Sequence, residues 1–167
     1  PNFRFTLARS LYKTILRYVN GNHSLACVVQ PLPVSNFRIV RTADNQLQLS
    51  WLPVTDRLEP SAVPTTYNIY IAEGKNGFDN GRSVSSTSFT LTPKPNVVYQ
   101  FRVTAVNRGG ESFPSTTLAA CVSAQAGARD VLVVDGFTRL AGPAVVDDGT
   151  RQGFDLDADM GVSLGIN

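Results

Sequence analysis

The sequence contains few of the residues that build catalytic or metal centres. Only one histidine, His23, and two cysteines, Cys27 and Cys121, occur among its 167 residues. A zinc site takes several His, Cys or carboxylate ligands, and a nucleophile needs an adjacent base. The chain also has no GxSxG elbow, P-loop or GxGxxG run. We therefore predict no catalytic residue, no metal and no cofactor, and place His23 in an exposed loop.

The two cysteines are too few for a disulfide framework and have no CxxC spacing. Free cysteine commonly behaves as a small core hydrophobe. We expect Cys27 and Cys121 to be buried free thiols, with a disulfide between them as the alternative.

A strong charge of one sign is missing as well. Fifteen Lys and Arg face thirteen Asp and Glu, which leaves a net charge of +2, and this excludes a nucleic-acid footprint. No apolar run approaches the roughly 18 residues of a membrane span. The chain starts at Pro1 without an initiator Met or an apolar leader, so we interpret it as a piece of a longer protein.

What is present begins with an amphipathic segment, residues 5–19. Its apolar residues recur with the i, i+3, i+4 spacing of a helix, and Asn20-Gly21 is typical of a helix end. On the opposite side Arg9, Lys13 and Arg17 recur every fourth residue. We interpret this basic face as a solvated surface, with a membrane surface or an acidic partner as the alternative.

From Pro31 the pattern changes to short alternating strands separated by turn residues, which is typical of an all-β domain. The central stretch is 98–112, in which apolar and polar residues alternate until Asn107-Arg108-Gly109-Gly110. The two glycines favour a hairpin turn there. Expected strands cover 37–40, 46–51, 67–71, 89–91, 98–106 and 116–123.

These strands carry a specific resemblance. Trp51-Leu52-Pro53, Tyr67-x-Ile69, and Leu91-Thr92-Pro93 followed by Tyr99 resemble the motifs of a fibronectin type III module over residues 31–124. The resemblance implies a seven-stranded immunoglobulin-like sandwich with a tyrosine corner at Tyr99. The loop 55–65 is longer than the family pattern. The expected core residues are Trp51, Tyr67, Ile69, Leu91, Tyr99, Phe101 and Val103.

Two surface features of the expected module were considered for binding. Residues 108–111, Arg-Gly-Gly-Glu, lack the adjacent aspartate of an Arg-Gly-Asp adhesion loop, which favours a plain hairpin turn. Tyr70 and Arg102 fall on the outward face of neighbouring strands, where they could form a surface contact. We expect that contact to be a neighbouring domain of the parent protein, with carbohydrate as the alternative.

The flanks show weaker resemblances. Residues 7–18 resemble the last helix of a zinc-dependent N-acetylmuramoyl-L-alanine amidase, and residues 131–137 resemble the opening of a domain in xanthan lyase-like proteins. We expect 1–30 to be the helix and linker left from a preceding domain, and 125–167 to be the start of a following α/β domain, with a buried strand at 131–134. Asp155, Asp157 and Asp159 lack the Gly and Glu of a calcium loop.

These readings predict a non-catalytic spacer or docking module of a secreted or periplasmic bacterial protein that acts on cell wall or polysaccharide. The alternative is a fragment of an enzyme, an amidase or a polysaccharide lyase, whose active site lies outside this chain. The N-terminal twenty residues have no acidic side chain, whereas the segment from Asp130 onward has seven aspartates. This opposition predicts that the two ends contact each other, with packing on another molecule as the alternative.

Overall fold

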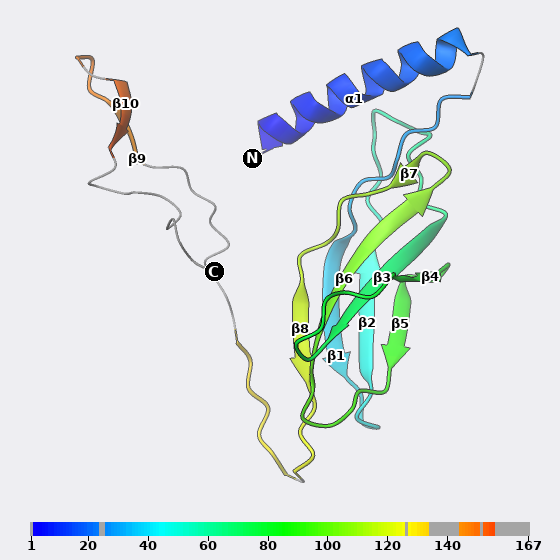
Figure 1. Ribbon diagram of the computed structural model, residues 1–167, viewed down its shortest axis with the longest axis vertical. Coiled ribbons are helices and arrows are strands. Elements are labelled where there is room, and N and C mark those ends of the chain that lie inside the picture. The colour runs from blue at the N-terminus through cyan, green and yellow to red at the C-terminus, as the bar shows by residue number, and fades with distance from the viewer. Residues whose placement is uncertain (1, 24–25, 126, 134–143, 151, 156–167) are drawn as a thin grey trace. The chain divides into compact units, whose positions relative to one another are not determined.

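The computed structural model describes residues 2–23, 26–125, 127–133, 144–150 and 152–155. The chain divides into two compact units, Pro1–Gly127 and Ala128–Asn167, and each is considered by itself (Figure 1). The expected contact between the chain ends, the calcium-like aspartates 157 and 159, and residue 134 lie outside what can be described.

Two antiparallel sheets form most of the first unit, as the sequence predicts (Figure 1). One sheet has the order β1 (Ser35–Arg41), β2 (Leu47–Leu52) and β5 (Ser88–Leu91). In the other, β4 (Arg82–Val84), β3 (Thr66–Glu73), β6 (Val98–Asn107) and β7 (Gly110–Glu111) follow one another, and β8 (Leu118–Cys121) also pairs with β6.

The inward-pointing side chains of the two sheets form the core. Along β3 and β6 the register pairs Tyr67 with Ala105, Ile69 with Val103, and Ile71 with Phe101, and all six are buried. Such apolar cross-strand pairs are what stabilise a sheet face. The structure places six of the seven expected core residues at 6% exposure or less, namely Trp51, Tyr67, Ile69, Tyr99, Phe101 and Val103. Leu91 is partly buried and packs against this core.

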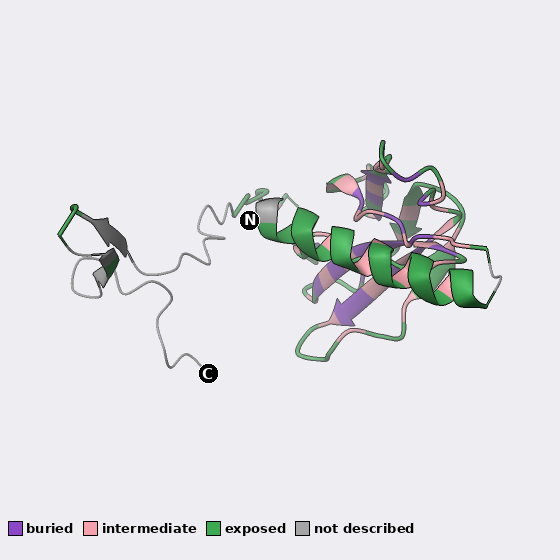
Figure 2. Ribbon diagram, turned by 90° about the horizontal axis from the view of Figure 1, so that it is seen from above, coloured by how far each residue is buried: buried purple, intermediate pink, exposed green. Residues whose placement is uncertain are grey.

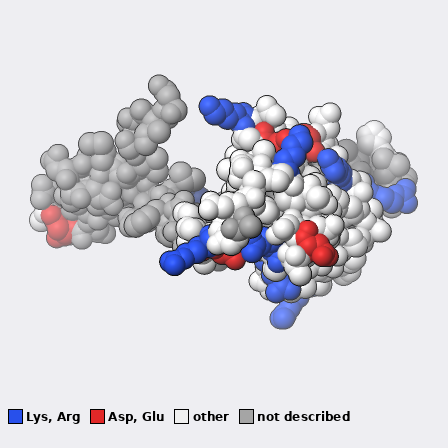
Figure 3. Space-filling model, turned by 90° about the horizontal axis from the view of Figure 1, so that it is seen from below, with Lys and Arg blue, Asp and Glu red and all other residues white. Residues whose placement is uncertain are grey.

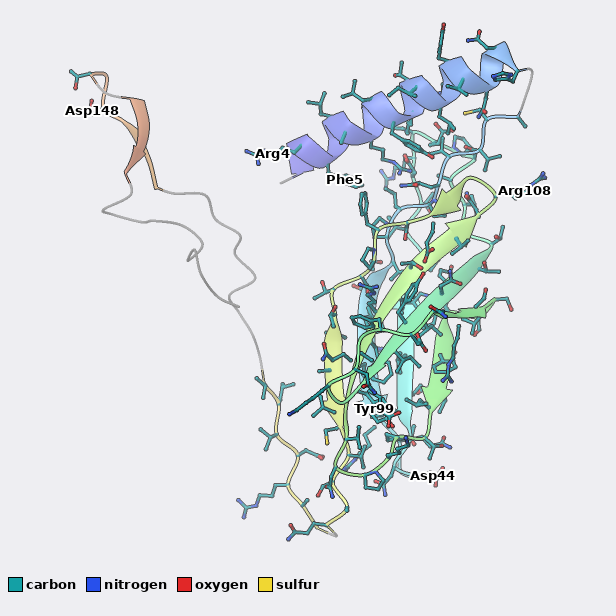
Figure 4. The ribbon with its side chains drawn as sticks, in the orientation of Figure 1. Arg4, Phe5, Asp44, Tyr99, Arg108 and Asp148 are labelled. Carbon is teal, nitrogen blue, oxygen red and sulfur yellow. The ribbon has the colours of Figure 1, made fainter. Side chains whose placement is uncertain are left out.

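Tyr99 forms the expected corner. Its hydroxyl accepts a hydrogen bond of 3.2 Å from the backbone amide of Lys94, and its ring stacks on Phe101 with the centroids 6.1 Å apart. Figure 4 shows Tyr99 within the lower half of the sandwich. The bond fixes the connection that leads from β5 into β6.

Replacing Tyr99 by phenylalanine should therefore lower the free energy of unfolding by about 1 kcal/mol, the net worth of one hydrogen bond. Tyr67→Phe is the matched control, because no described residue bonds the Tyr67 hydroxyl, although the ring is also buried. Urea unfolding of the two variants measures the difference. Equal losses would show that the corner bond contributes nothing.

The helix α1 (Asn2–Asn22) is longer than the sequence pattern indicates. Asn20-Gly21 does not end it, since Gly21 does not take the positive φ of a left-handed cap. His23 follows in a turn and is exposed, as expected.

The prediction of buried cysteines is wrong, although both thiols are free. Cys27 is half-buried in the segment after α1. Cys121 is exposed because it ends β8, where every second side chain faces outward.

The second unit contains the hairpin β9 (Ala144–Asp147) and β10 (Gln152–Asp155), joined by a turn in which Asp148 accepts from the Thr150 amide at 2.9 Å. The expected buried strand at its start is wrong for the residues that can be described. Val131, Leu132 and Val133 are not in a strand and are 84–86% exposed, because no second layer covers them within this unit's described part.

Candidate functional site

The most unusual feature of the first unit is the way α1 meets the sandwich. The half-buried residues of the helix are Arg9, Tyr12, Lys13, Leu16 and Asn20. They share one face of the helix, and two of them, Arg9 and Lys13, belong to the basic face. The interpretation of this basic face as a solvated surface is therefore wrong.

The partners of the basic face lie in the long loop between β2 and β3. Asp56 starts a turn there, with Oδ1 accepting from the Leu58 amide at 3.0 Å, and the Glu59 amide donates to the Asp56 carbonyl at 3.1 Å. This local pattern is typical of Asp at the start of a turn. It presents two carboxylates, three residues apart, to the helix.

Four ion pairs join the two elements. Arg9 contacts Asp56 at 2.9 Å and Arg17 contacts Glu59 at 2.8 Å, while Lys13 lies 3.6 Å from Asp56 and 3.7 Å from Glu59. The side chains of Arg9, Lys13, Asp56 and Glu59 are all 14% exposed or less. We call Arg9, Lys13, Arg17, Asp56 and Glu59 the helix-docking cluster.

Low exposure makes this cluster more consequential than an ordinary surface pair. Exposed ion pairs contribute little, but removing one member of a desolvated, hydrogen-bonded pair leaves its partner uncompensated. The Arg9 Nε also donates to Asp56 at 3.0 Å. The cluster therefore fixes both the position and the rotation of α1.

The segment that connects α1 to the sandwich is held by the same helix face. Nη2 of Arg9 donates to the backbone carbonyl of Gln30 at 3.1 Å, and the backbone amide of Gln30 donates to the Tyr12 hydroxyl at 3.4 Å. The Val29 side chain is fully buried. The connection thus runs along the domain surface as part of the fold.

Asn107, at the end of β6, ties this segment to two loops. Its Nδ2 donates to the carbonyls of Val29, Ser61 and Val63 at 2.9, 3.1 and 3.3 Å, and its Oδ1 accepts from Gly109 at 2.8 Å. The side chain is 9% exposed. One amide group thereby satisfies backbone groups from three parts of the chain.

Gly109 is required here by space. A Cβ at this position would lie 2.3 Å from the Val28 carbonyl oxygen and 2.8 Å from the Val29 carbonyl carbon. Only Gly110 of the pair has a positive φ, 129°. The turn between β6 and β7 is the expected hairpin, and Figure 4 shows the Arg108 side chain pointing away from the sandwich.

The cluster depends on pH through Asp56. Burial raises the pKa of this carboxyl, but the hydrogen bonds from Arg9 and Leu58 and the nearby charges of Lys13 and Arg9 outweigh burial, so the pKa lies below its ordinary 3.8. A carboxyl with a lowered pKa contributes stability that is complete above the unfolded value and is lost as pH falls through the folded one. The stabilisation that ionised Asp56 gives to the docked α1 is therefore complete above about pH 3.8 and is lost as the pH falls below that value.

The opposite face of α1 is apolar and uncovered. Figure 2 shows most of the helix in the colour of exposed residues, whereas buried positions concentrate in the strands. The exposed fractions are 51% for Leu7, 57% for Leu11, 63% for Ile15, 72% for Tyr18 and 46% for Val19. We call these five residues the outer helix face. Exposed apolar residues gathered on one face of a helix are typical of an interaction surface.

The structure also brings together the expected surface pair. Tyr70 and Arg102 are direct partners across β3 and β6, and the guanidinium lies 5.1 Å from the Tyr70 ring centroid and 4.2 Å from that of Phe78. The Tyr70 hydroxyl donates to Glu111 at 2.6 Å. The Tyr70 ring is therefore occupied by Arg102, and Glu111 joins the pair as a third member.

Among the described residues, no group of three His, Cys, Asp or Glu could hold a metal ion, and no helix has the length and hydropathy of a bilayer-spanning segment. On the face shown in Figure 3, acidic and basic side chains are interspersed over the described surface.

Sequence reasoning missed the helix-docking cluster. A signal was present in the sequence. Arg9, Lys13 and Arg17 recur every fourth residue, and two acidic residues of opposite charge, Asp56 and Glu59, lie three residues apart in the loop that is longer than the family pattern. Pairing them requires knowing that this loop and α1 lie at the same end of the sandwich (Figure 1).

The geometry agrees with comparisons to known proteins. A family model described as "Fibronectin type III domain" matches residues 32–120, more than half of the chain. A search of curated proteins finds no match.

Solved structures support the same fold. The twitchin kinase region from C. elegans is similar with 23% identity and a TM-score of 0.50 over 60% of this chain. The fourth FNIII domain of a human protein is similar with 22% identity and a TM-score of 0.51, covering 64% of this chain and 90% of the other. The chain spans only 18% of the twitchin structure. These likenesses agree with the two-sheet sandwich and the tyrosine corner, and the family model over residues 32–120 shows that the chain belongs to the fibronectin type III domain family.

Proposed function

We propose that this fibronectin type III domain is a docking module that holds a helix of a neighbouring domain at a fixed orientation. Modules of this family commonly serve as non-catalytic parts of multidomain proteins. The observation that carries the proposal is the orientation of α1, whose face with Arg9, Tyr12, Lys13 and Leu16 is turned to the sandwich while the outer helix face is exposed.

An isolated amphipathic helix would gain more by burying its apolar face. Here the helix-docking cluster uses the charged face for the sandwich and leaves the apolar face for a second set of contacts. In this arrangement α1 packs on the sandwich through the helix-docking cluster and on a neighbouring domain through the outer helix face. Residues 1–30 are then the last part of that preceding domain. A helix shared in this way transmits the orientation of one domain to the next.

The parent protein is proposed from the flanking sequence alone. The likeness of residues 7–18 to an amidase helix and of 131–137 to a xanthan lyase-like opening supports a secreted or periplasmic bacterial protein that acts on cell wall or polysaccharide. The activity of that parent, amidase or lyase, would reside outside this chain.

A charge exchange across the cluster tests the docking role. Reversing Arg9 and Lys13 to Glu should lower hydrogen-exchange protection of the α1 amides about tenfold or more, because four like charges then meet. Adding Arg17→Glu, Asp56→Lys and Glu59→Lys in the same chain exchanges all five charges of the cluster and should restore much of that protection. The matched control is Arg4→Glu, which changes an exposed residue of the same helix outside the cluster.

Recovery in the fivefold variant requires that the two sets of charges meet in solution. If the exchange of charges lowered protection further, or if no variant changed it, the sandwich would not hold α1 through these groups. Protection measured at rising salt should fall only slightly, since ion pairs with this little exposure are screened much less than surface pairs.

A further inference from the structure

A pocket of about 450 Å³ opens on the outer face of the β3–β6–β7 sheet. The residues that line it include Gln30, Tyr70, Arg102, Thr104, Glu111 and Phe113. It combines an aromatic ring, a carboxylate, a guanidinium and an amide around one opening, and none of these groups is used by the helix-docking cluster.

The carboxylate of Glu111 is held in one orientation. Its Oε1 accepts hydrogen bonds from the Tyr70 hydroxyl at 2.6 Å, from Asn68 at 3.3 Å and from the Thr104 hydroxyl. Burial raises the pKa of Glu111, but these hydrogen bonds and the charge of Arg102 outweigh it and leave the pKa below its ordinary 4.5. Glu111 is thus a fixed, ionised acceptor whose Oε2 forms no hydrogen bond to a described residue.

The guanidinium of Arg102 is also fixed and has unused donors. It lies over the rings of Phe78 and Tyr70, and its Nε is buried without a hydrogen-bond partner. That nitrogen is out of reach of a ligand. The two Nη groups of Arg102, which lines the pocket, donate no hydrogen bond to a described residue and are the donors available to a ligand.

Phe113 supplies an apolar surface at the rim. Its side chain is 64% exposed, although it directly follows a residue that is 6% exposed, Ser112. An exposed aromatic ring beside polar groups offers stacking area without the entropy of a flexible side chain.

The charges restrict the chemistry of the ligand. An anion would meet the Glu111 carboxylate, a cation would meet Arg102, and a purely apolar ligand would leave both groups desolvated. A ligand with many hydroxyls and no charge satisfies all of them, because a hydroxyl both donates, to Glu111, and accepts, from Arg102. The C–H face of such a ligand can stack on the Phe113 ring.

We propose that this pocket binds a neutral sugar residue of a polysaccharide, held between Glu111, Arg102 and Phe113. The site is distinct from the docking of α1 and does not depend on it, since its three anchoring residues lie on the sandwich itself. It also differs from the simple stacking on Tyr70 that the sequence suggests, because that ring is already covered by Arg102.

An NMR titration of the ¹⁵N-labelled chain tests the proposal. Cellohexaose and chitohexaose are the neutral probes, hexagalacturonate the anionic one and the chitosan hexamer the cationic one. We expect saturable shifts of the backbone amides at Tyr70, Arg102, Glu111 and Phe113 with at least one neutral probe, at millimolar Kd.

Two variants examine the anchoring groups. Phe113→Ala and Glu111→Gln should each weaken binding about tenfold, while Val98→Ala, an exposed apolar truncation away from the pocket, should leave Kd unchanged. A Kd that is insensitive to Phe113→Ala, stronger binding of a charged probe, or no shift with any probe would overturn the proposal. Lys13→Glu alone weakens the helix-docking cluster without touching a residue that lines the pocket, and it should leave this Kd unchanged, which separates the site from the docking role.

Discussion

Replacing Trp51 by alanine should lower the free energy of unfolding by about 3–5 kcal/mol, the usual cost of removing a large aromatic side chain from a core. Trp51 is 2% exposed and contacts Tyr67 edge to face, with the ring centroids 5.5 Å apart. It lies on β2 and meets β3, so its ring joins the two sheets. Chemical denaturation followed by circular dichroism measures the loss.

Trp51→Phe is the informative control. The Trp51 Nε1 is buried without a hydrogen-bond partner, so phenylalanine removes volume but breaks no hydrogen bond. The expected loss is about 1 kcal/mol. A loss for alanine no larger than that for phenylalanine would contradict the position of Trp51 between the sheets.

Replacing Asn107 by alanine should destabilise the domain by about 2–4 kcal/mol, because buried backbone groups that lose a partner cost about 1–3 kcal/mol each. The side chain bonds three carbonyls and one amide. Loss of the Val29 contact should also release the segment between α1 and the sandwich. The α1 amides should then exchange faster than the strand amides do.

Gln48→Ala provides the comparison for Asn107. Gln48 is exposed on β2, and exposed positions of this kind change stability by no more than about 0.5 kcal/mol. If Asn107→Ala behaved like Gln48→Ala, the amide would not be the common partner of these loops in solution.

The sandwich could be predicted from sequence because its determinants are local. Alternation placed Leu47, Leu49 and Trp51 on one face and Phe101, Val103 and Ala105 on another, and period-2 patterning fixes which side chains face the core. The bond from the Lys94 amide to the Tyr99 hydroxyl was expected from the resemblance of residues 91–99 to a tyrosine corner.

The orientation of α1 could not be predicted in the same way. The helical spacing correctly separated an apolar from a basic face, but a periodicity states only that two faces differ. Which face packs depends on Asp56 and Glu59, more than 40 residues away, and on the turn that presents them. The expectation of a solvated basic face therefore failed at the residues that carry the proposed function.

Gly109 illustrates the same limit at one position. Sequence reasoning assigned the glycine pair to the conformational needs of a tight turn, and Gly110 meets that description. Gly109 is instead required by the backbone of Val28 and Val29, which passes within 3 Å of where its Cβ would lie. A close approach between distant segments leaves no local pattern.

The orientation of α1 is the central claim, and methyl and aromatic NOEs of the monomeric chain at neutral pH test it most directly. The account predicts NOEs from the Tyr12 ring to Gln30 and from the Arg9 and Lys13 side chains to residues 56–59. It predicts none between the sandwich and the methyl groups of Leu11 or Ile15. NOEs from Leu11 and Ile15 to sandwich residues, with Arg9 and Lys13 free of such contacts, would show that the helix packs on its apolar face and would contradict the account.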